Sequence, residues 1–144
     1  MPEPLPRLLA TAFKAARGDL QRRLEEHGVY AGQDYLLDAL SEEDGLTVGA
    51  LAERLRIEVP TVVKTVQRME AAGLVRRSPD PADRRRSLVH LTERGRAVLP
   101  AVREALAAVS EQGTAGLSVE ERAELLRMLA VVSENLRSGN RDCG

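Results

Sequence analysis

At 144 residues the chain is long enough to bury a hydrophobic core and short enough for a single domain. Its apolar stretches fall well short of the ~18 residues that a membrane-spanning helix needs, and its first residues lack the basic leader and apolar block of a secretory signal. The single cysteine, Cys143, cannot form an internal disulfide, so a cytoplasmic protein is expected.

The formal net charge of −1 conceals an uneven distribution of charged residues. Residues 61–96 contain nine Lys/Arg and four Asp/Glu, whereas the segments on either side are acidic on balance. A run of basic residues usually forms only a solvated face, but it also provides the surface that a chain of phosphates needs. Aromatic residues make up 2% of the chain and none follows Tyr35, which argues against the base-stacking platforms of proteins that bind single strands or RNA.

Two helices are predicted in the first third of the chain. Over residues 6–27 apolar side chains recur at spacings of three and four, at Leu9, Phe13, Ala16, Leu20 and Leu24. Gly28 then supplies a residue that readily adopts the left-handed conformation found at helix ends. A second, shorter helix is predicted over residues 33–40, and a polar loop over residues 41–45 separates it from the next element.

A pair of helices joined by a tight turn is predicted next. Thr47 is a suitable N-cap for a helix that extends to Leu55, and Pro60 fits the first turn of another helix that ends at Gly73. The second helix of the pair has an apolar face formed by Val62, Val66 and Met69. A separate polar and basic face is formed by Thr61, Lys64, Thr65 and Arg68.

Two antiparallel strands are predicted after the helix pair, over Leu74–Arg77 and Ser87–Leu91. Alternation places Val89 and Leu91 on one face of the second strand. Between the strands lies a turn-rich tip with three consecutive arginines, Arg84, Arg85 and Arg86. A helix pair followed by a basic hairpin is typical of a winged helix-turn-helix, which places one helix in the major groove of duplex DNA and the hairpin beside it.

The last third of the chain predicts two further helices. Thr92 caps the first of them, and Gly95 allows its first turn to approach a neighbouring segment closely. Pro100 lies inside this helix and removes one hydrogen bond, so a kink is expected there. Ser118 and Glu121 form a capping box for a last helix. The apolar stripe of that helix consists of Leu125, Leu129, Val132 and Leu136.

Three short motifs in and after the basic hairpin resemble the wing signature of the MarR (multiple antibiotic resistance regulator) family of bacterial regulators: Asp83-x-Arg85, Val89-x-Leu91-Thr92 and Gly95. The segment over residues 61–75 is similar to the family's recognition helix and the strand after it. The resemblance covers nearly the whole chain. It implies a mainly α, winged helix-turn-helix fold of about six helices plus a two-stranded wing, in which the N- and C-terminal helices form a dimerisation lobe.

On this resemblance, residues 1–144 form a single domain, with the DNA-binding region over about 33–96 and dimerisation helices over about 5–30 and 97–137. The implied function is that of a sequence-specific, double-stranded DNA-binding transcriptional regulator. The expected protein is a ligand-responsive repressor that binds a palindromic operator as a homodimer. Apolar stripes at both ends of the chain support a dimer independently, because they exceed what one thin winged unit could cover.

The resemblance also implies the residues that contact DNA. The recognition helix would meet bases or phosphates in the major groove through Thr61, Lys64, Thr65, Gln67 and Arg68. The wing would reach the minor groove through Arg84, Arg85 or Arg86. Asp83 would hold one of these arginines by a charge-assisted hydrogen bond. Val59-Pro60 departs from the family, in which this position is often polar.

Members of the family often respond to small aromatic or anionic ligands. The candidate ligand-binding residues in this chain combine cationic donors with apolar walls, and they are Lys14, Arg17, Tyr30 and Tyr35. The alternative interpretation places Tyr35 in the core and leaves Lys14 and Arg17 solvated. The first helix contains no cysteine, so the sequence does not favour the cysteine-based peroxide sensing of some family members.

Other classes of function have little support in the sequence. No phosphate-binding glycine loop and no set of nucleophile and base is recognisable, so neither an enzyme activity nor a cofactor is expected. Two His and one Cys far apart in the sequence do not form a recognisable metal site. The competing hypothesis is a winged-helix architectural or protein-interaction module without ligand sensing, although the basic wing argues against pure protein binding.

Overall fold

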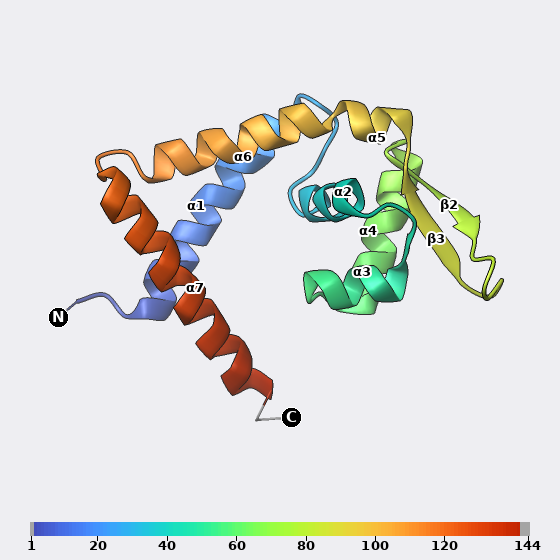
Figure 1. Cartoon of the computed structure of the whole chain (residues 1–144). Helices are drawn as coiled ribbons and strands as arrows, with labels where there is room; N and C mark the ends of the chain where they lie inside the picture. The colour runs from blue at the N-terminus through green and yellow to red at the C-terminus, as the bar shows by residue number, and fades with distance from the viewer. Residues whose placement is uncertain (1, 142–144) are drawn as a thin grey trace. The chain divides into compact units, whose positions relative to one another are not determined.

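The computed structural model of the chain describes residues 2–141 (Figure 1), so Cys143 lies outside the described residues. These residues form two compact units, one extending to Val109 and the other beginning at Ser110. In chain order the elements are α1 (Leu5–Glu25), α2 (Gln33–Glu42), β1 (Leu46–Thr47), α3 (Val48–Leu55), α4 (Val59–Ala71), β2 (Val75–Pro79), β3 (Ser87–Leu91), α5 (Glu93–Ala97), α6 (Leu99–Gly113) and α7 (Val119–Arg141).

The first helix buries only the end of its predicted apolar stripe. Leu24 is fully buried and Leu20 packs against the core, whereas Phe13 near the middle of α1 is 59% exposed. Gly28 has a φ of +71° and follows the helix as predicted. The predicted helix over 33–40 is confirmed as α2, and its apolar residues Leu36, Leu37 and Leu40 are buried.

The helix pair is formed as the sequence predicts. Thr47 caps α3 by accepting a hydrogen bond at 3.1 Å from the backbone N–H of Ala50. Pro60 lies in the first turn of α4, and Gly73, with a φ of +76°, follows its end. The predicted apolar face of α4 is confirmed, because Val62, Val66 and Met69 are all buried. This face packs α4 against α3 and β2 (Figure 1), so its polar face points away from the core.

The strands form one antiparallel sheet in the order β1–β3–β2. The β2–β3 hairpin pairs from Val75 with Leu91 to Pro79 with Ser87, and Val89 and Leu91 are buried as the alternation predicts. The sequence predicts a wing of two strands, whereas the structure has a sheet of three, because β1 pairs with β3. A strand of two residues is too short to show an alternating pattern, so nothing in the sequence signals it.

Gly95 brings α5 into close contact with Leu74, the residue that precedes the first wing strand, β2. A Cβ atom at this position would lie 2.1 Å from the carbonyl oxygen of Leu74, so only glycine fits without a shift of the backbone. Thr92 caps α5 through the backbone N–H of Gly95 and also donates to the carbonyl of Gly73. The single helix predicted here is divided into α5 and α6 at Val98, two residues before Pro100, where the sequence predicts a kink.

The second unit consists of the end of α6, a short connection and α7. Ser118 and Glu121 form the predicted capping box, with reciprocal backbone-to-side-chain hydrogen bonds of 2.9 and 3.1 Å. No residue of α7 is buried by the described chain. Large apolar side chains of this unit are therefore exposed, among them Leu117, Val119, Leu126, Met128, Leu129, Val131 and Leu136. None of the described helices combines the length and the apolar character needed to cross a membrane.

Candidate nucleic-acid interface

The outward face of α4 presents the polar residues that the sequence predicts for DNA contact. Lys64, Gln67 and Arg68 are exposed on this face, as is Thr61 at its start, while Thr65 is half-buried. The hydroxyl of Thr65 donates a hydrogen bond of 2.8 Å to the carbonyl oxygen of Thr61. This bond orients the hydroxyl, which leaves the oxygen lone pairs of Thr65 free to accept from a base or another donor.

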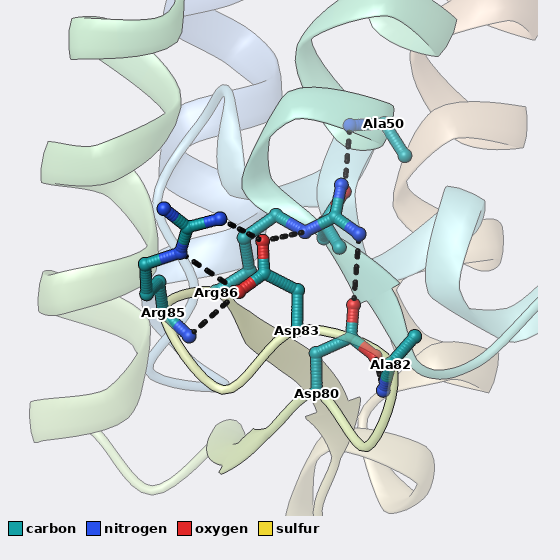
Figure 2. Close-up of polar contacts among 7 residues, drawn as sticks. Ala50, Asp80, Ala82, Asp83, Arg85 and Arg86 are labelled. Carbon is teal, nitrogen blue, oxygen red and sulfur yellow. Dashed lines mark hydrogen bonds and ion pairs between the residues drawn. The ribbon is translucent and has the colours of Figure 1, made fainter.

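The loop between β2 and β3 is a closed turn held by backbone and carboxylate hydrogen bonds (Figure 2). The backbone N–H of Asp80 donates to the carbonyl of Arg86 at 3.0 Å, and that of Arg86 donates to the carbonyl of Asp83 at 2.9 Å. The Asp80 carboxylate accepts from the backbone N–H of Ala82 at 2.9 Å. The buried Asp80 carboxylate therefore stabilises the loop at the tip of the wing.

Asp83 is the second carboxylate that orders the wing tip. Its Oδ1 accepts hydrogen bonds of 3.1 Å from both the backbone N–H and the Nε of Arg85 (Figure 2). Hydrogen bonds from the Arg85 side chain and backbone, together with the charge of Arg86, hold the pKa of the Asp83 carboxyl below its ordinary value. The structure thus places Asp83 against a wing arginine, where the family resemblance puts it.

The three wing arginines differ in how they are held. The side chain of Arg85 is 91% exposed although it pairs with Asp83. Arg86 lies 3.4 Å from the buried Asp80 and 3.8 Å from Asp83 (Figure 2). Arg84 is exposed and has no ion pair among the residues that the structure describes. Arg84 and Arg85 are therefore available to a ligand, whereas Arg86 is bound by two carboxylates of the wing loop itself.

Two contacts that support this surface were not predicted from the sequence. Asp80 stands directly before Pro81, a turn-forming dipeptide that could have indicated a structural carboxylate. Glu70 in α4 pairs with Arg77 on β2, but seven residues and a change of secondary structure separate the two. No local spacing rule would have connected them, because such rules apply within one helix or strand.

A cavity of about 720 Å³ opens on the surface of the first unit, between α1, α2 and α4. Three of the four predicted ligand residues line it, namely Arg17, Tyr30 and Tyr35, whereas Lys14 does not. Tyr35 is 53% exposed, so the alternative that placed this side chain in the core is wrong. Arg17 is held in place by its position over the Phe13 ring and by a hydrogen bond of 3.4 Å to the carbonyl of Ala31.

The opposite wall of this cavity belongs to α4. It is formed in part by three of the residues predicted to contact DNA, Thr61, Thr65 and Arg68. The cavity therefore offers two guanidinium groups, from Arg17 and Arg68, among hydroxyl groups and aromatic rings. Such a lining suits a small planar anion, because cations and hydroxyl groups bind its charge while the rings cover its faces.

Residues 31–86 match a family model described as MarR family. The chain is 30% identical over 127 residues to the HTH-type transcriptional repressor NicR of Pseudomonas putida, covering 88% of this chain and 80% of that protein. It is also 32% identical over 102 residues to a Thauera aromatica protein named for regulation of the hcr operon, and this match covers 71% of the chain and 61% of the relative.

Solved structures give the same result for the fold. A MarR transcriptional regulator from Methanosarcina mazei superposes with a TM-score of 0.84 at 25% identity, covering 93% of this chain and 96% of that one. A mutant MarR from Escherichia coli complexed with operator DNA gives 0.82 at 25% identity, with 90% and 93% covered. Bordetella bronchiseptica BpsR, described as regulated in DNA binding by 6-hydroxynicotinic acid, gives 0.82 at 27% identity, with 91% and 94% covered.

Proposed function

Because the chain belongs to the MarR family of winged-helix transcriptional regulators, we propose that it is a ligand-responsive repressor that binds a palindromic operator as a homodimer. The observation that carries the proposal is the joint exposure of the polar face of α4 and of the arginine-rich wing tip on one compact unit. The family consists of DNA-binding regulators rather than enzymes. We place the protein in the cytoplasm, where its DNA is.

In this proposal α4 and the wing contact different grooves of the DNA. On α4, Thr61, Lys64, Thr65, Gln67 and Arg68 contact base edges and phosphates in the major groove. Arg84 and Arg85 enter the adjacent minor groove, whose negative potential attracts guanidinium groups. Arg86 contributes mainly by holding the wing, since Asp80 and Asp83 already bind it. The similarity to a MarR protein solved with operator DNA supports this division.

The helices at the two ends of the chain form the dimer. In the first unit Leu5, Leu8 and Phe13 of α1 are 49–59% exposed, and in the second unit no residue of α7 is buried. Apolar surface of this extent is unusual on a soluble monomer and indicates a protein partner. We therefore assign about 33–96 to DNA binding and about 5–30 and 97–137 to dimerisation within one domain over 1–144.

The cavity between α1, α2 and α4 is the ligand site in this proposal. Its two guanidinium groups and two tyrosine rings suit a small aromatic anion. Since Thr61, Thr65 and Arg68 also belong to the DNA-contacting face, a bound ligand withdraws the same side chains from the major groove. Ligand and operator then bind in competition, and the ligand releases the repressor from DNA. BpsR, with its regulation by a hydroxylated aromatic acid, is consistent with this arrangement.

The function is tested by letting the purified protein select duplexes from a randomised library. Enrichment of an inverted repeat with half-sites about 10 bp apart is expected for a two-fold symmetric regulator, and affinity for the selected duplex should fall steeply with salt. Aromatic acids such as salicylate are then titrated against the complex. A protein that remains monomeric and enriches no duplex at low ionic strength would contradict the proposal. Selective binding that no aromatic acid reverses would favour an architectural module without ligand sensing.

A further inference from the structure

Asp44, in the loop between α2 and β1, gathers three groups from the base of the wing. Its Oδ1 accepts a hydrogen bond of 2.9 Å from the backbone N–H of Leu91, the last residue of β3. Its Oδ2 lies 3.1 Å from a guanidinium nitrogen of Arg96 on α5 and 3.6 Å from Nδ1 of His90 on β3. One carboxylate therefore connects this loop to the end of the wing and to the helix that follows it.

His90 extends this connection across the hairpin. Its second ring nitrogen, Nε2, lies 2.9 Å from the hydroxyl oxygen of Ser78 on β2. Its side chain is 19% exposed, so the imidazole is largely enclosed by these partners. Ser78, His90 and Asp44 thus form a continuous chain of polar contacts from one wing strand, through the other, to the loop before β1.

The loop approaches His90 closely because of the residue after Asp44. A Cβ atom on Gly45 would lie 3.1 Å from Cε1 of the imidazole, and the φ of this residue is +71°. The backbone N–H of Gly45 also donates to the carbonyl of Val89 at 3.0 Å. Glycine is thus required both by the backbone conformation and by the space available, and it brings the Asp44 carboxylate to the wing.

The charged groups around His90 come from three elements. Asp44, in the loop before β1, lies beside the imidazole. Arg96 on α5 pairs with the same Asp44 carboxylate, and Arg76 on β2 is the cross-strand partner of His90. In the neutral imidazole, Nδ1–H donates toward Asp44 and the Ser78 hydroxyl donates to Nε2. In the imidazolium both nitrogens donate, and the contact with Asp44 becomes an ion pair.

We propose that Asp44 is a positioning residue for DNA binding, which holds the base of the wing through Leu91 and His90, and that protonation of His90 tightens this hold. The proposal rests on the DNA-binding function proposed above, because the wing carries Arg84 and Arg85. It makes operator affinity a function of pH. With the imidazole protonated, its contact with Asp44 is an ion pair, the wing root is held more firmly and the affinity is higher.

Three variants separate the effect of the Asp44 charge from that of the His90 imidazole. Asp44→Asn keeps an oxygen that can accept from the Leu91 N–H but removes the charge that attracts the imidazolium. His90→Gln removes the imidazole. His27→Gln is the matched control, because His27 is the other histidine of the chain and lies, exposed, just after α1. Each variant is compared with the parent protein between pH 5.5 and pH 8.

The first measurement requires no DNA. The chemical shift and hydrogen exchange of the Leu91 amide are followed by NMR across the pH range. In the parent protein and in His27→Gln the amide should become better protected as pH falls. In Asp44→Asn and His90→Gln this change should be lost, although the amide should remain hydrogen-bonded in Asp44→Asn. A Leu91 amide with the same pH response in His90→Gln as in the parent would overturn the proposal.

The second measurement is the affinity for the duplex selected by the protein itself, at constant ionic strength. The parent protein and His27→Gln should gain about two- to fivefold in affinity from pH 8 to pH 6 relative to His90→Gln, which is the size expected of one partly exposed ion pair. Asp44→Asn should lose most of this gain. An equal gain in Asp44→Asn and in the parent would show that His90 acts by attracting DNA directly, and would overturn the role of Asp44. If the parent selects no duplex, the proposed function fails, while the Leu91 amide still decides the coupling between Asp44 and His90.

Discussion

Glu70, in the last turn of α4, accepts two hydrogen bonds from the guanidinium of Arg77 on β2, at 2.9 Å from Nη2 and 3.2 Å from Nε. The two side chains are 37% and 40% exposed. The hydrogen bond from Arg77, with its charge, lowers the pKa of Glu70, and the same contact raises the pKa of Arg77. This pair connects the end of α4, the helix proposed to enter the major groove, to the first strand of the wing.

Replacement of the Glu70 carboxylate should make the stability of the protein less dependent on pH. Because the pKa of Glu70 is lower in the folded chain than in the unfolded one, its contribution is complete at neutral pH and is lost as pH falls through the folded value. Glu70→Gln should therefore lower Tm at pH 7 and converge with the parent in acid. Thermal unfolding followed by circular dichroism between pH 3 and pH 7 tests this. A difference in Tm that stays constant down to pH 3 would argue against a charge effect.

Removal of an exposed wing arginine should weaken DNA binding while leaving the fold intact. Arg85→Ala is expected to reduce affinity for the selected duplex by about 1–3 kcal/mol. Because the Arg85 side chain is 91% exposed, its Tm should stay close to that of the parent. Fluorescence anisotropy and thermal unfolding measure the two quantities. Unchanged affinity in a folded Arg85→Ala protein would remove Arg85 from the DNA interface.

Replacement of Arg86 should lower thermal stability, unlike replacement of Arg85. Arg86→Ala removes the ion pair with the buried Asp80 carboxylate and the contact with Asp83. It should lower both Tm and DNA affinity, since an uncompensated buried carboxylate destabilises the wing. If Arg85→Ala and Arg86→Ala have the same effect on Tm, the wing arginines do not differ in the way that the contacts indicate.

Two glycines in helices should respond in opposite directions to a methyl group. Gly95→Ala is expected to destabilise the chain by about 1–3 kcal/mol, the usual cost of overpacking, because its Cβ would lie 2.1 Å from the Leu74 carbonyl. Gly18 lies inside α1 with no atom within 4 Å of an added Cβ, so Gly18→Ala should stabilise by about 0.5–1 kcal/mol. Chemical denaturation of both variants measures these changes. A tolerated Gly95→Ala would show that α5 can move away from Leu74.

A substitution in the cavity should alter the response to the ligand and leave DNA binding unchanged. Arg17 lines the cavity from α1, whereas the residues proposed to contact DNA line it from α4, so Arg17→Ala should bind the selected duplex as the parent does. The concentration of salicylate that releases DNA should rise about tenfold, consistent with the loss of a hydrogen bond to a charged group. Lys14→Ala, one turn earlier on the same helix, is the matched control and should respond like the parent. An identical response in all three proteins would place the ligand elsewhere.

Much of the fold could be predicted because its signals are local. Thr47, Thr92 and Ser118 cap helices where the sequence places caps, and the face of α4 formed by Val62, Val66 and Met69 is buried. Each of these features depends on residues within one or two turns of each other. The polar face of α4, formed by Thr61, Lys64, Thr65 and Arg68, follows from the same periodicity. Its role in DNA contact is implied by the family resemblance.

The remaining features depend on segments that are distant in the sequence. The β1 strand exists only because β3 is beside it, and Asp44 meets Leu91 across 47 residues. Lys14 and Arg17 are both cationic and lie one turn apart, yet only Arg17 lines the cavity. Composition identifies candidate residues for such a site, but the positions of α1, α2 and α4 around the cavity decide which of them take part.

The cavity shared between α1 and α4 constrains how this regulator can diversify. Thr61, Thr65 and Arg68 line the cavity and also stand on the face proposed to contact the operator. If these residues contact the operator as proposed, a substitution at any of the three that admits a new effector also changes the promoters that the protein recognises. Descendants of this chain can adopt a new inducer independently only through the Arg17 and tyrosine side of the cavity, so we expect divergence in effector choice to be concentrated there.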